Sequence, residues 1–221
     1  MNNSTLNKKA ATRIIFLFIL IQLLAGIIPL FLPESLGAAR ALIPSLVFFS
    51  LGAIGMIFIE KRFNMSFAFE EKISKRKKDI LLWGVLGVFI ALFAQNIANF
   101  IEVQYLGSGT ESVNTQMLVE FVRSYPIFIV IIGVAGPIME EFVFRKAIFG
   151  MLIEKTGGIG AAVISSLLFA FIHFDGFLLV YSAMGFVFSW LYFKTKNIWT
   201  PILAHSLMNI IAVLANLYLT Q

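Results

Sequence analysis

The 221-residue chain contains no cysteine and only two histidines, His173 and His205. The absence of cysteine excludes disulfide bonds, thiolate metal sites and a cysteine nucleophile, and it leaves the redox compartment open. Charged residues make up 13% of the chain and hydrophobic residues 59%, whereas a soluble domain has about 25% charged and about 45–50% apolar residues. This balance excludes an ordinary soluble domain and predicts a multi-pass membrane protein.

Long apolar runs predict an all-α, polytopic bundle of transmembrane helices. At about 20 residues for each span, the length suits about seven spans in a single integral membrane domain, residues 1–221. The first run follows a basic head, as in a signal sequence, but its length and the poor cleavage site after it favour a retained span. The expected spans are roughly 13–32, 41–60, 80–103, 125–152, 159–174, 177–193 and 198–219.

The basic residues are distributed unevenly between the two sides of this topology. Only Arg40 and Arg123 fall on one side, so the other side is predicted to be cytoplasmic, with the N-terminus there and the C-terminus external. We interpret the net charge of +5 as this bias, with possible contact to anionic lipid headgroups, and not as nucleic-acid binding. The basic residues on the predicted cytoplasmic side are Lys8, Lys9, Arg13, Lys61, Arg62, Lys72, Lys75, Arg76, Lys77, Lys78, Arg145, Lys146, Lys155, Lys194 and Lys196.

Residues 102–124 form the only sizeable outer loop of this topology. The loop is polar and contains Gly107-Ser108-Gly109-Thr110. We expect it either to be mobile or to cap the outer surface.

Two glutamates and an arginine lie inside the fourth expected span, where ionisable residues are costly and are therefore functional candidates. Glu140 and Glu141 are neighbours, so on a helix they point about 100° apart and cannot share one role. Glu141 and Arg145 are four residues apart, in the order that favours an ion pair. Glu140 is then left without an arginine on its own helix, which suits a general base. The alternative is that all three side chains form a buried packing network.

The two histidines lie in later apolar runs, and each has a companion one helical turn away. Phe169 precedes His173 by four residues, and Asn209 follows His205 by four. Taken alone, His173 could be a hydrogen-bonded residue at the interface near a helix end, and His205 and Asn209 could be a hydrogen-bonded pair between membrane helices. Together with Glu140, however, these side chains could hold a water molecule, take its proton and stabilise an oxyanion, as an amide hydrolase requires.

Metal-dependent hydrolysis remains open at this point, because glutamate and histidine both bind zinc. The spacing of the residues does not separate it from activation of water by glutamate alone. The helix motif His-Glu-x-x-His of soluble zinc proteases is absent from the chain.

Small residues and a proline precede the glutamates: Gly133, Gly136 and Pro137. Glycine lets helices approach closely, and proline frees a backbone carbonyl one turn earlier. We interpret this stretch as an opening for substrate or water. The alternative is a packing notch with a kink.

Three motifs, each on its own apolar run and in this order, resemble the CPBP family. That family covers CAAX proteases and bacteriocin-processing enzymes, and it includes the Abi proteins and type II CAAX prenyl endopeptidases. The resemblance covers residues from about 125 to 212, which would be the catalytic core, and the first 120 residues match only as generic spans. The motifs are Glu-Glu-x-x-x-Arg (Glu140, Glu141, Arg145), Phe-x-x-x-His (Phe169, His173) and His-x-x-x-Asn (His205, Asn209).

The resemblance implies an intramembrane glutamic endopeptidase that needs no metal or other cofactor. By motif position, it implies that Glu140 and His173 activate the water. It further implies that His205 and Asn209 stabilise the oxyanion, while Glu141 and Arg145 support the site. One feature of the predicted topology fits this poorly, because His173 lies near the outer end of its span and His205 in the inner half of its own. Helices must therefore tilt, or the last span must begin inside the membrane, which is tolerated where helices line a polar cavity.

The expected substrate is a membrane-associated peptide or protein, such as a bacteriocin leader, a signalling-peptide precursor or a lipid-modified tail. The expected location is the prokaryotic plasma membrane. A first alternative is a non-enzymatic immunity or scaffold protein that binds a bacteriocin or a sensor kinase, although the intact motif set favours the enzyme. A second is a proton-coupled transporter that uses Glu140 and the histidines as a relay, but the matching broken helices that would support it are not evident in the sequence.

Overall fold

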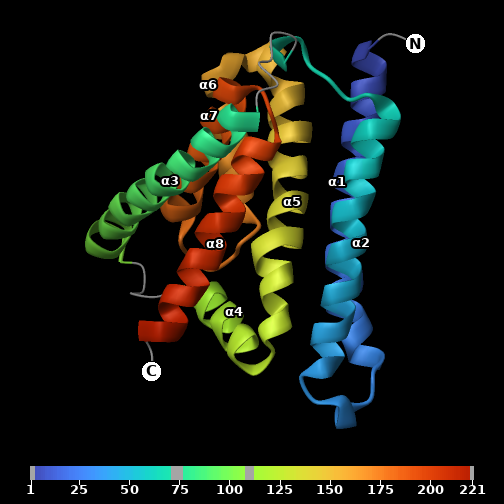
Figure 1. Ribbon diagram of the computed structural model, residues 1–221, viewed down its shortest axis with the longest axis vertical. Coiled ribbons are helices and arrows are strands. Elements are labelled where there is room, and N and C mark those ends of the chain that lie inside the picture. Colours follow the sequence, from blue (N-terminus) through green and yellow to red (C-terminus); the bar gives the residue numbers. More distant parts are fainter. Residues whose placement is uncertain (1–2, 71–76, 108–111, 220–221) are drawn as a thin grey trace.

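The computed structural model describes residues 3–70, 77–107 and 112–219, and within these ranges the protein is helical and has no strand. Short 3-10 turns lie at Ile28–Phe31, Glu34–Leu36, Ala68–Glu70 and Pro126–Phe128, and π-helical segments lie at Ile131–Ala135 and Phe142–Phe149. The α-helices, shown in Figure 1, are α1 (Asn3–Ile27), α2 (Ala39–Phe63), α3 (Lys77–Tyr105), α4 (Val113–Ser124), α5 (Gly136–Glu141), α6 (Gly150–Phe171), α7 (Leu178–Thr195) and α8 (Trp199–Leu219).

Among the described residues, six helical segments are long and apolar enough to cross a membrane. They are Ser4–Phe31, Ala39–Phe63, Lys77–Tyr105, Pro126–Phe171, Leu178–Thr195 and Trp199–Tyr218. The prediction of an all-α, multi-pass membrane bundle is therefore confirmed.

The segment Pro126–Phe171 contains the fourth and fifth predicted spans, and it folds back on itself. Gly157 has non-helical backbone angles, φ 70° and ψ 175°. The hydroxyl of Ser165 donates a hydrogen bond of 2.6 Å to the carbonyl of Phe144, 21 residues earlier, although a straight helix of that length would hold them about 31 Å apart. The segment is therefore a helical hairpin with its bend at Gly157, between the fourth and fifth predicted spans.

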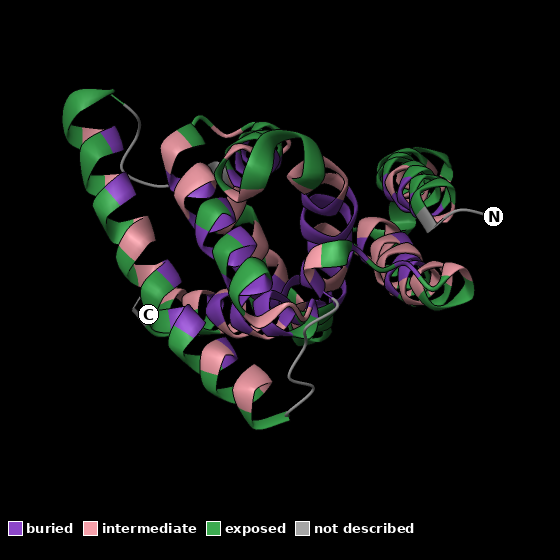
Figure 2. Cartoon of the chain, turned by 90° about the horizontal axis from the view of Figure 1, so that it is seen from above, coloured by how far each residue is buried: buried purple, intermediate pink, exposed green. Residues whose placement is uncertain are grey.

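This hairpin lies at the centre of the bundle. In the most apolar 18-residue stretch of Pro126–Phe171, two-thirds of the residues are buried. In the corresponding stretches of the first three spans, only 17–28% are buried. Helices α1 and α2 run side by side along one flank, and α3 lies on another and packs against α7 and α8 (Figure 1). Seen from above, buried residues face the middle of the bundle and exposed residues face outward (Figure 2). The Glu-Glu-x-x-x-Arg motif and Phe169 are thus carried by the most enclosed span, whereas His205 and Asn209 lie on α8.

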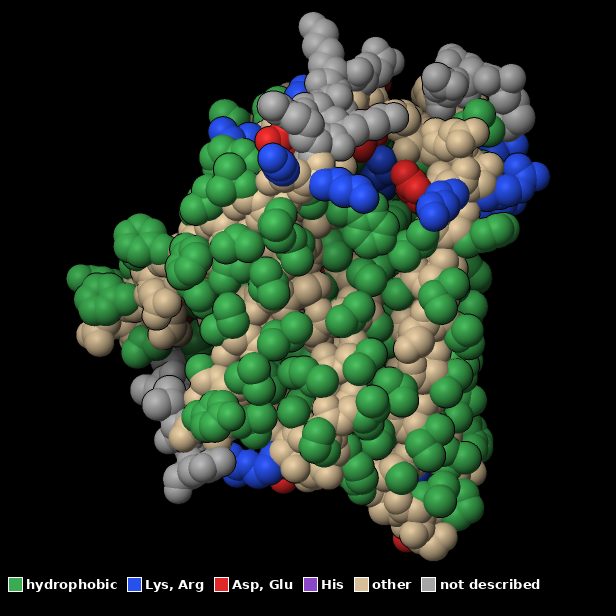
Figure 3. Space-filling view, viewed as in Figure 1, with side chains coloured by type: hydrophobic (Ala, Val, Ile, Leu, Met, Phe, Trp, Pro, Cys, Tyr) green, Lys and Arg blue, Asp and Glu red, His purple; other side chains and the backbone are tan. Residues whose placement is uncertain are grey.

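The outer surface has the pattern expected of a membrane protein. On the face shown in Figure 3, hydrophobic side chains cover the middle of the molecule, while lysine and arginine gather at the end that holds the N-terminus, with fewer at the other end. Three residues of the predicted basic side, Lys72, Lys75 and Arg76, lie outside the described residues. That the basic end faces the cytoplasm stays a prediction.

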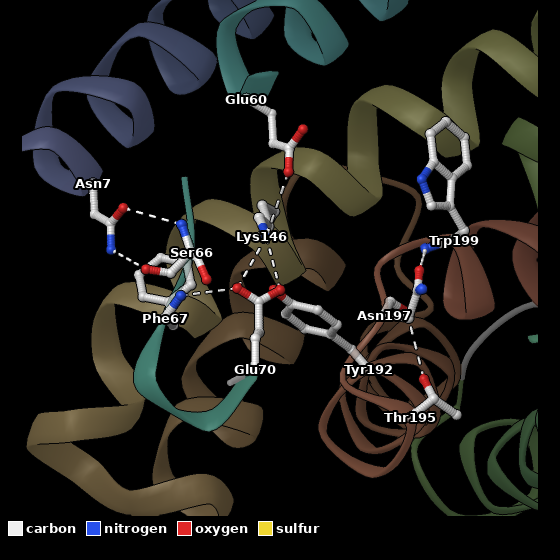
Figure 4. Close-up of polar contacts among 10 residues, drawn as sticks. All are labelled: Asn7, Glu60, Ser66, Phe67, Glu70, Lys146, Tyr192, Thr195, Asn197 and Trp199. Atoms are coloured by element: carbon white, nitrogen blue, oxygen red, sulfur yellow. Dashed lines mark hydrogen bonds and ion pairs between the residues drawn. The ribbon is translucent and has the colours of Figure 1, made fainter. Parts of the chain in front are cut away.

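Two of the basic residues assigned to that side are not surface charges. Arg145 is fully buried and Lys146 is 4% exposed. Lys146 donates hydrogen bonds of 2.7 and 3.0 Å to the buried carboxylate of Glu70, which also accepts one from the hydroxyl of Tyr192 (Figure 4). Glu60 lies 3.8 Å from the same ammonium group. A buried charge requires such partners. The network therefore fixes the helix that carries Glu140, Glu141 and Arg145, which we call the motif helix, to α7 and to the connection between α2 and α3.

Candidate active site

The helix that carries the glutamates is widened by a π-helical turn just before them. In this turn the N–H of Gly136 bonds to the carbonyl of Ile131, five residues earlier. The next bond in the same register would join the carbonyl of Ile132 to residue 137, but Pro137 has no N–H. The side-chain amide of Asn209 donates to this carbonyl at 3.2 Å instead. The prediction that the proline frees a backbone carbonyl is confirmed, and α8 supplies the donor that satisfies it.

Glycines allow the neighbouring helices to approach the motif helix. A Cβ atom on Gly133 would lie 2.6 Å from a side-chain carbon of Ile210 on α8, so a larger residue there would require Ile210 to shift. A Cβ atom on Gly185 of α7 would lie 3.0 Å from Ser166 and 3.2 Å from Nη2 of Arg145. These contacts confirm that small residues permit close helix packing in this region.

Glu141 and Arg145 form an ion pair in the interior of the bundle. The two side chains are fully buried, and Nη1 of Arg145 lies 3.1 Å from Oε1 of Glu141. Arg145 also donates to the carbonyl of Gly185 at 3.0 Å, and its guanidinium lies 4.6 Å from the ring centre of Phe169 and 5.4 Å from that of Phe188. The predicted pairing is confirmed, and its partners on α6 and α7 show that the pair joins three elements.

His205 lies between the two glutamates. Its Nδ1 atom is 2.9 Å from Oε1 of Glu141, and its Nε2 atom is 3.7 Å from Oε2 of Glu140. Its ring stacks on Phe188, with the ring centres 4.7 Å apart and the planes 18° apart. A carboxylate accepts, so Nδ1 donates to Glu141 and Nε2 is directed toward Glu140. The sequence did not indicate this bond, because it joins residues 64 positions apart.

His173 lies in the turn that follows α6. Its Nδ1 atom is 2.8 Å from the carbonyl oxygen of Phe169, and its ring stacks on Tyr181 with the ring centres 3.9 Å apart and the planes 20° apart. Because a carbonyl can only accept a hydrogen bond, Nδ1 carries the hydrogen and Nε2 of the neutral ring is left as an acceptor. The four-residue spacing thus lets His173 contact both the backbone carbonyl and the ring of Phe169.

A polar cluster next to the start of α4 supports His173, and the sequence analysis missed it. The carboxylate of Asp175 accepts hydrogen bonds from Tyr181 at 2.9 Å and from Ser112 at 2.6 Å. Ser112 in turn accepts from the backbone N–H of Thr115 and so caps the start of α4. The only available signal was the position of Asp175, two residues after His173. Helix α4, which belongs to the predicted outer loop, thus covers one side of the site. Ser108, Gly109 and Thr110 of that loop lie outside the described residues.

Glu140, His173, His205 and Asn209 all line one cavity of about 490 Å³. Glu141 and Arg145 lie behind this lining and contact it through His205. Glu140 keeps 20% of its side chain exposed, whereas Glu141 has none. The structure therefore brings together the four residues to which the family resemblance gives a part in the reaction, and it separates the two glutamates as the helical spacing predicted.

The contact between the two histidine motifs removes the difficulty in the predicted topology. The helix from Gly158 to Phe171 is only about 21 Å long, whereas the hydrocarbon core is about 30 Å thick. A helix of this length that begins at one membrane surface ends before it reaches the other. The ring centre of Phe169, one turn before His173, is 5.9 Å from that of His205, so the two histidine motifs meet.

Within the described part of the chain, no three His, Asp or Glu side chains are grouped so that they could hold a metal ion. The site contains two carboxylates and two imidazoles, but the buried carboxylate is already shared by Arg145 and His205.

The sequence is similar to a known family and to bacterial membrane proteins. The family described as "Type II CAAX prenyl endopeptidase Rce1-like" matches residues 122–211. The "Membrane-embedded CAAX protease MroQ" of Staphylococcus aureus (strain USA300) is 36% identical over 171 residues, which cover 74% of this chain and 69% of that protein.

Another relative is the "Putative membrane peptidase YdiL" of Bacillus subtilis (strain 168). It is 48% identical over 138 residues, which are 62% of this chain and 57% of that protein. The match thus spans little more than half the length of the Bacillus protein. No solved structure matches the chain significantly.

Proposed function

Because the chain belongs to the CPBP family of CAAX protease-like membrane proteins, we propose that it is an intramembrane glutamic endopeptidase. Its substrates would be membrane-associated peptides or proteins. The observation that carries this proposal is the cavity inside the helix bundle onto which Glu140, His173, His205 and Asn209 converge. An acid-base residue and hydrogen-bond donors around one enclosed volume are what hydrolysis of an amide requires.

In the proposed reaction, Glu140 is the general base. It takes one proton from a water molecule, and the second hydrogen of that water is held by Nε2 of His173, which is left as an acceptor by the contact of Nδ1 with Phe169. The hydroxide attacks the peptide carbonyl carbon and gives a tetrahedral intermediate. When the carbon–nitrogen bond breaks, protonated Glu140 gives its proton to the leaving amine. The carboxylate is then restored, and no covalent bond to the protein is formed.

His205 and Asn209 are proposed to stabilise the oxyanion. Asn209 uses one amide hydrogen on the carbonyl of Ile132, and its second remains for the oxyanion. His205 donates through Nδ1 to Glu141, so it can also donate through Nε2 only as the imidazolium. Before the reaction, the carboxylates of Glu140 and Glu141 would balance that charge, and once Glu140 has taken the proton, the oxyanion would take its place.

Glu141 is proposed to position His205 and not to react. Its Oε1 atom is shared by Arg145 and His205, and its side chain has no exposed surface. A base held in this way cannot reach a water molecule in the cavity. This division of roles makes the two neighbouring glutamates separable by experiment.

The proposal is tested by a cleavage assay in liposomes. Wild type and Glu140→Gln are offered a panel of membrane-anchored peptides, each with and without a lipid-modified cysteine, and each reaction is run with and without a chelator. We expect cleavage that depends on Glu140 and resists the chelator. Cleavage that the chelator abolishes would instead support a metal-dependent mechanism. Full turnover by Glu140→Gln would refute the glutamate mechanism.

A further inference from the structure

Two carboxamides of α3, Gln95 and Asn99, line the cavity and have no part in the proposed mechanism. They are four residues apart and so share one face of the helix. The Oε1 atom of Gln95 is buried and has no hydrogen-bond partner among the described residues. An unsatisfied polar group at membrane depth is costly. Its presence there calls for a partner that enters the cavity.

Asn96 provides a contrast on the same helix. Its side chain is exposed on the outside of the bundle, and its amide donates to the carbonyl of Leu92 at 2.7 Å. On this outer face of α3, the backbone of the same helix therefore provides a partner for the carboxamide. The acceptor oxygen of Gln95, by comparison, has no partner among the described residues and belongs to a side chain that lines the cavity.

The chemistry of a carboxamide suits one kind of ligand in particular. A peptide must be extended to be cleaved, and at membrane depth its backbone N–H and C=O groups then lack the bonds that a helix would give them. Asparagine and glutamine offer both a donor and an acceptor, which complement these two groups. The described residues that line the cavity include no lysine or arginine, so nothing there selects an acidic ligand.

We propose that Gln95 and Asn99 form a subsite that hydrogen-bonds to the backbone of an extended peptide in the cavity. The inference rests on the proposed function and adds to it a substrate class: peptide segments that lose their helical bonds in the site and are held by their main chain. Apolar residues of the same lining, such as Phe128 and Ile131, accommodate apolar side chains. Recognition through the main chain tolerates variation in the substrate sequence.

The test measures binding in nanodiscs on a Glu140→Gln background, so that the probe is not consumed. The probe is a dansyl-labelled, apolar peptide of alanine and leucine, and its match is a depsipeptide in which esters replace alternate amides and so remove N–H donors. We expect the protein to bind the peptide about tenfold more tightly than the depsipeptide. Adding Gln95→Leu and Asn99→Leu should abolish this difference. Adding Asn96→Leu, the matched control, should preserve it.

Equal binding of the two probes by the parent protein would overturn the inference, as would a difference that survives the double substitution. A cleavage assay separates this result from the fate of the proposed function. If cleavage depends on Glu140 but the probes bind equally, the endopeptidase function is supported and the main-chain subsite is refuted. If the probes are distinguished as expected but no peptide is cleaved, the main-chain site stands and the endopeptidase falls.

Discussion

Glu141 holds His205 through a hydrogen bond of 2.9 Å between Oε1 and Nδ1, in the interior of the protein. The same oxygen lies 3.1 Å from Arg145, so one buried carboxylate links α8 to the motif helix. This bond sets the direction of the imidazole ring and leaves its Nε2 atom facing Glu140. The second glutamate of the motif therefore orients a histidine, while the first is left in contact with the cavity.

Arg145→Ala is expected to destabilise the protein strongly. The substitution leaves the carboxylate of Glu141 buried without its cation and removes the bond to the carbonyl of Gly185. Breaking a buried pair on one side costs about 3–5 kcal/mol. Thermal unfolding in detergent, followed by circular dichroism, measures the effect, with Arg62→Ala as the control because Arg62 is exposed. Equal melting temperatures for the two variants would show that the ion pair does not stabilise the fold.

Tyr181 is expected to position His173 through its ring more than through its hydroxyl. The rings stack with their centres 3.9 Å apart, and an aromatic pair contributes about 0.5–1.5 kcal/mol. We expect Tyr181→Leu to lower kcat by about tenfold with little change in KM, because the imidazole loses its packing partner. Tyr181→Phe keeps the ring and should remain close to wild type. If the two variants lose activity equally, the hydroxyl and its bond to Asp175 are what matter.

Glu102 is expected to stabilise the start of α7. It is 2% exposed, and its two carboxylate oxygens accept the backbone N–H groups of Leu179 and Val180, each at 3.0 Å. Glu102→Leu leaves both donors unsatisfied, which costs about 1–3 kcal/mol for each buried group. Urea unfolding in detergent measures the loss, and the exposed Glu120→Leu serves as its control. Stability equal to the control would mean that water satisfies these donors.

The sequence was informative wherever a relationship lay within one helix. Apolar runs gave the membrane bundle, and the spacing of Glu141 and Arg145 gave their ion pair, because residues four apart meet on any helix. Pro137 predicted the freed carbonyl, and the limits of the fourth and fifth expected spans predicted a break that contains the bend at Gly157. Each of these predictions needed only local geometry.

Relationships between helices were beyond the sequence, since they depend on how the helices cross. The bond from Glu141 to His205 and the stack of Tyr181 on His173 each join separate elements. Lys146 was counted among the basic residues of the predicted cytoplasmic side, and nothing in the sequence showed that it would be buried. It is buried against Glu70, a residue of the connection between α2 and α3 that no periodic pattern marks.

The division of roles between the two glutamates is tested most directly by the single-turnover cleavage rates of Glu140→Gln and Glu141→Gln, measured side by side. General-base catalysis contributes about 10²–10⁴-fold to the rate, so the single-turnover rate of Glu140→Gln is expected to fall by at least about 100-fold. Glu141→Gln can still accept a hydrogen bond from His205, so it should keep a measurable rate. The reverse order, with Glu141→Gln inactive and Glu140→Gln still turning over, would contradict the assignment of Glu140 as the base.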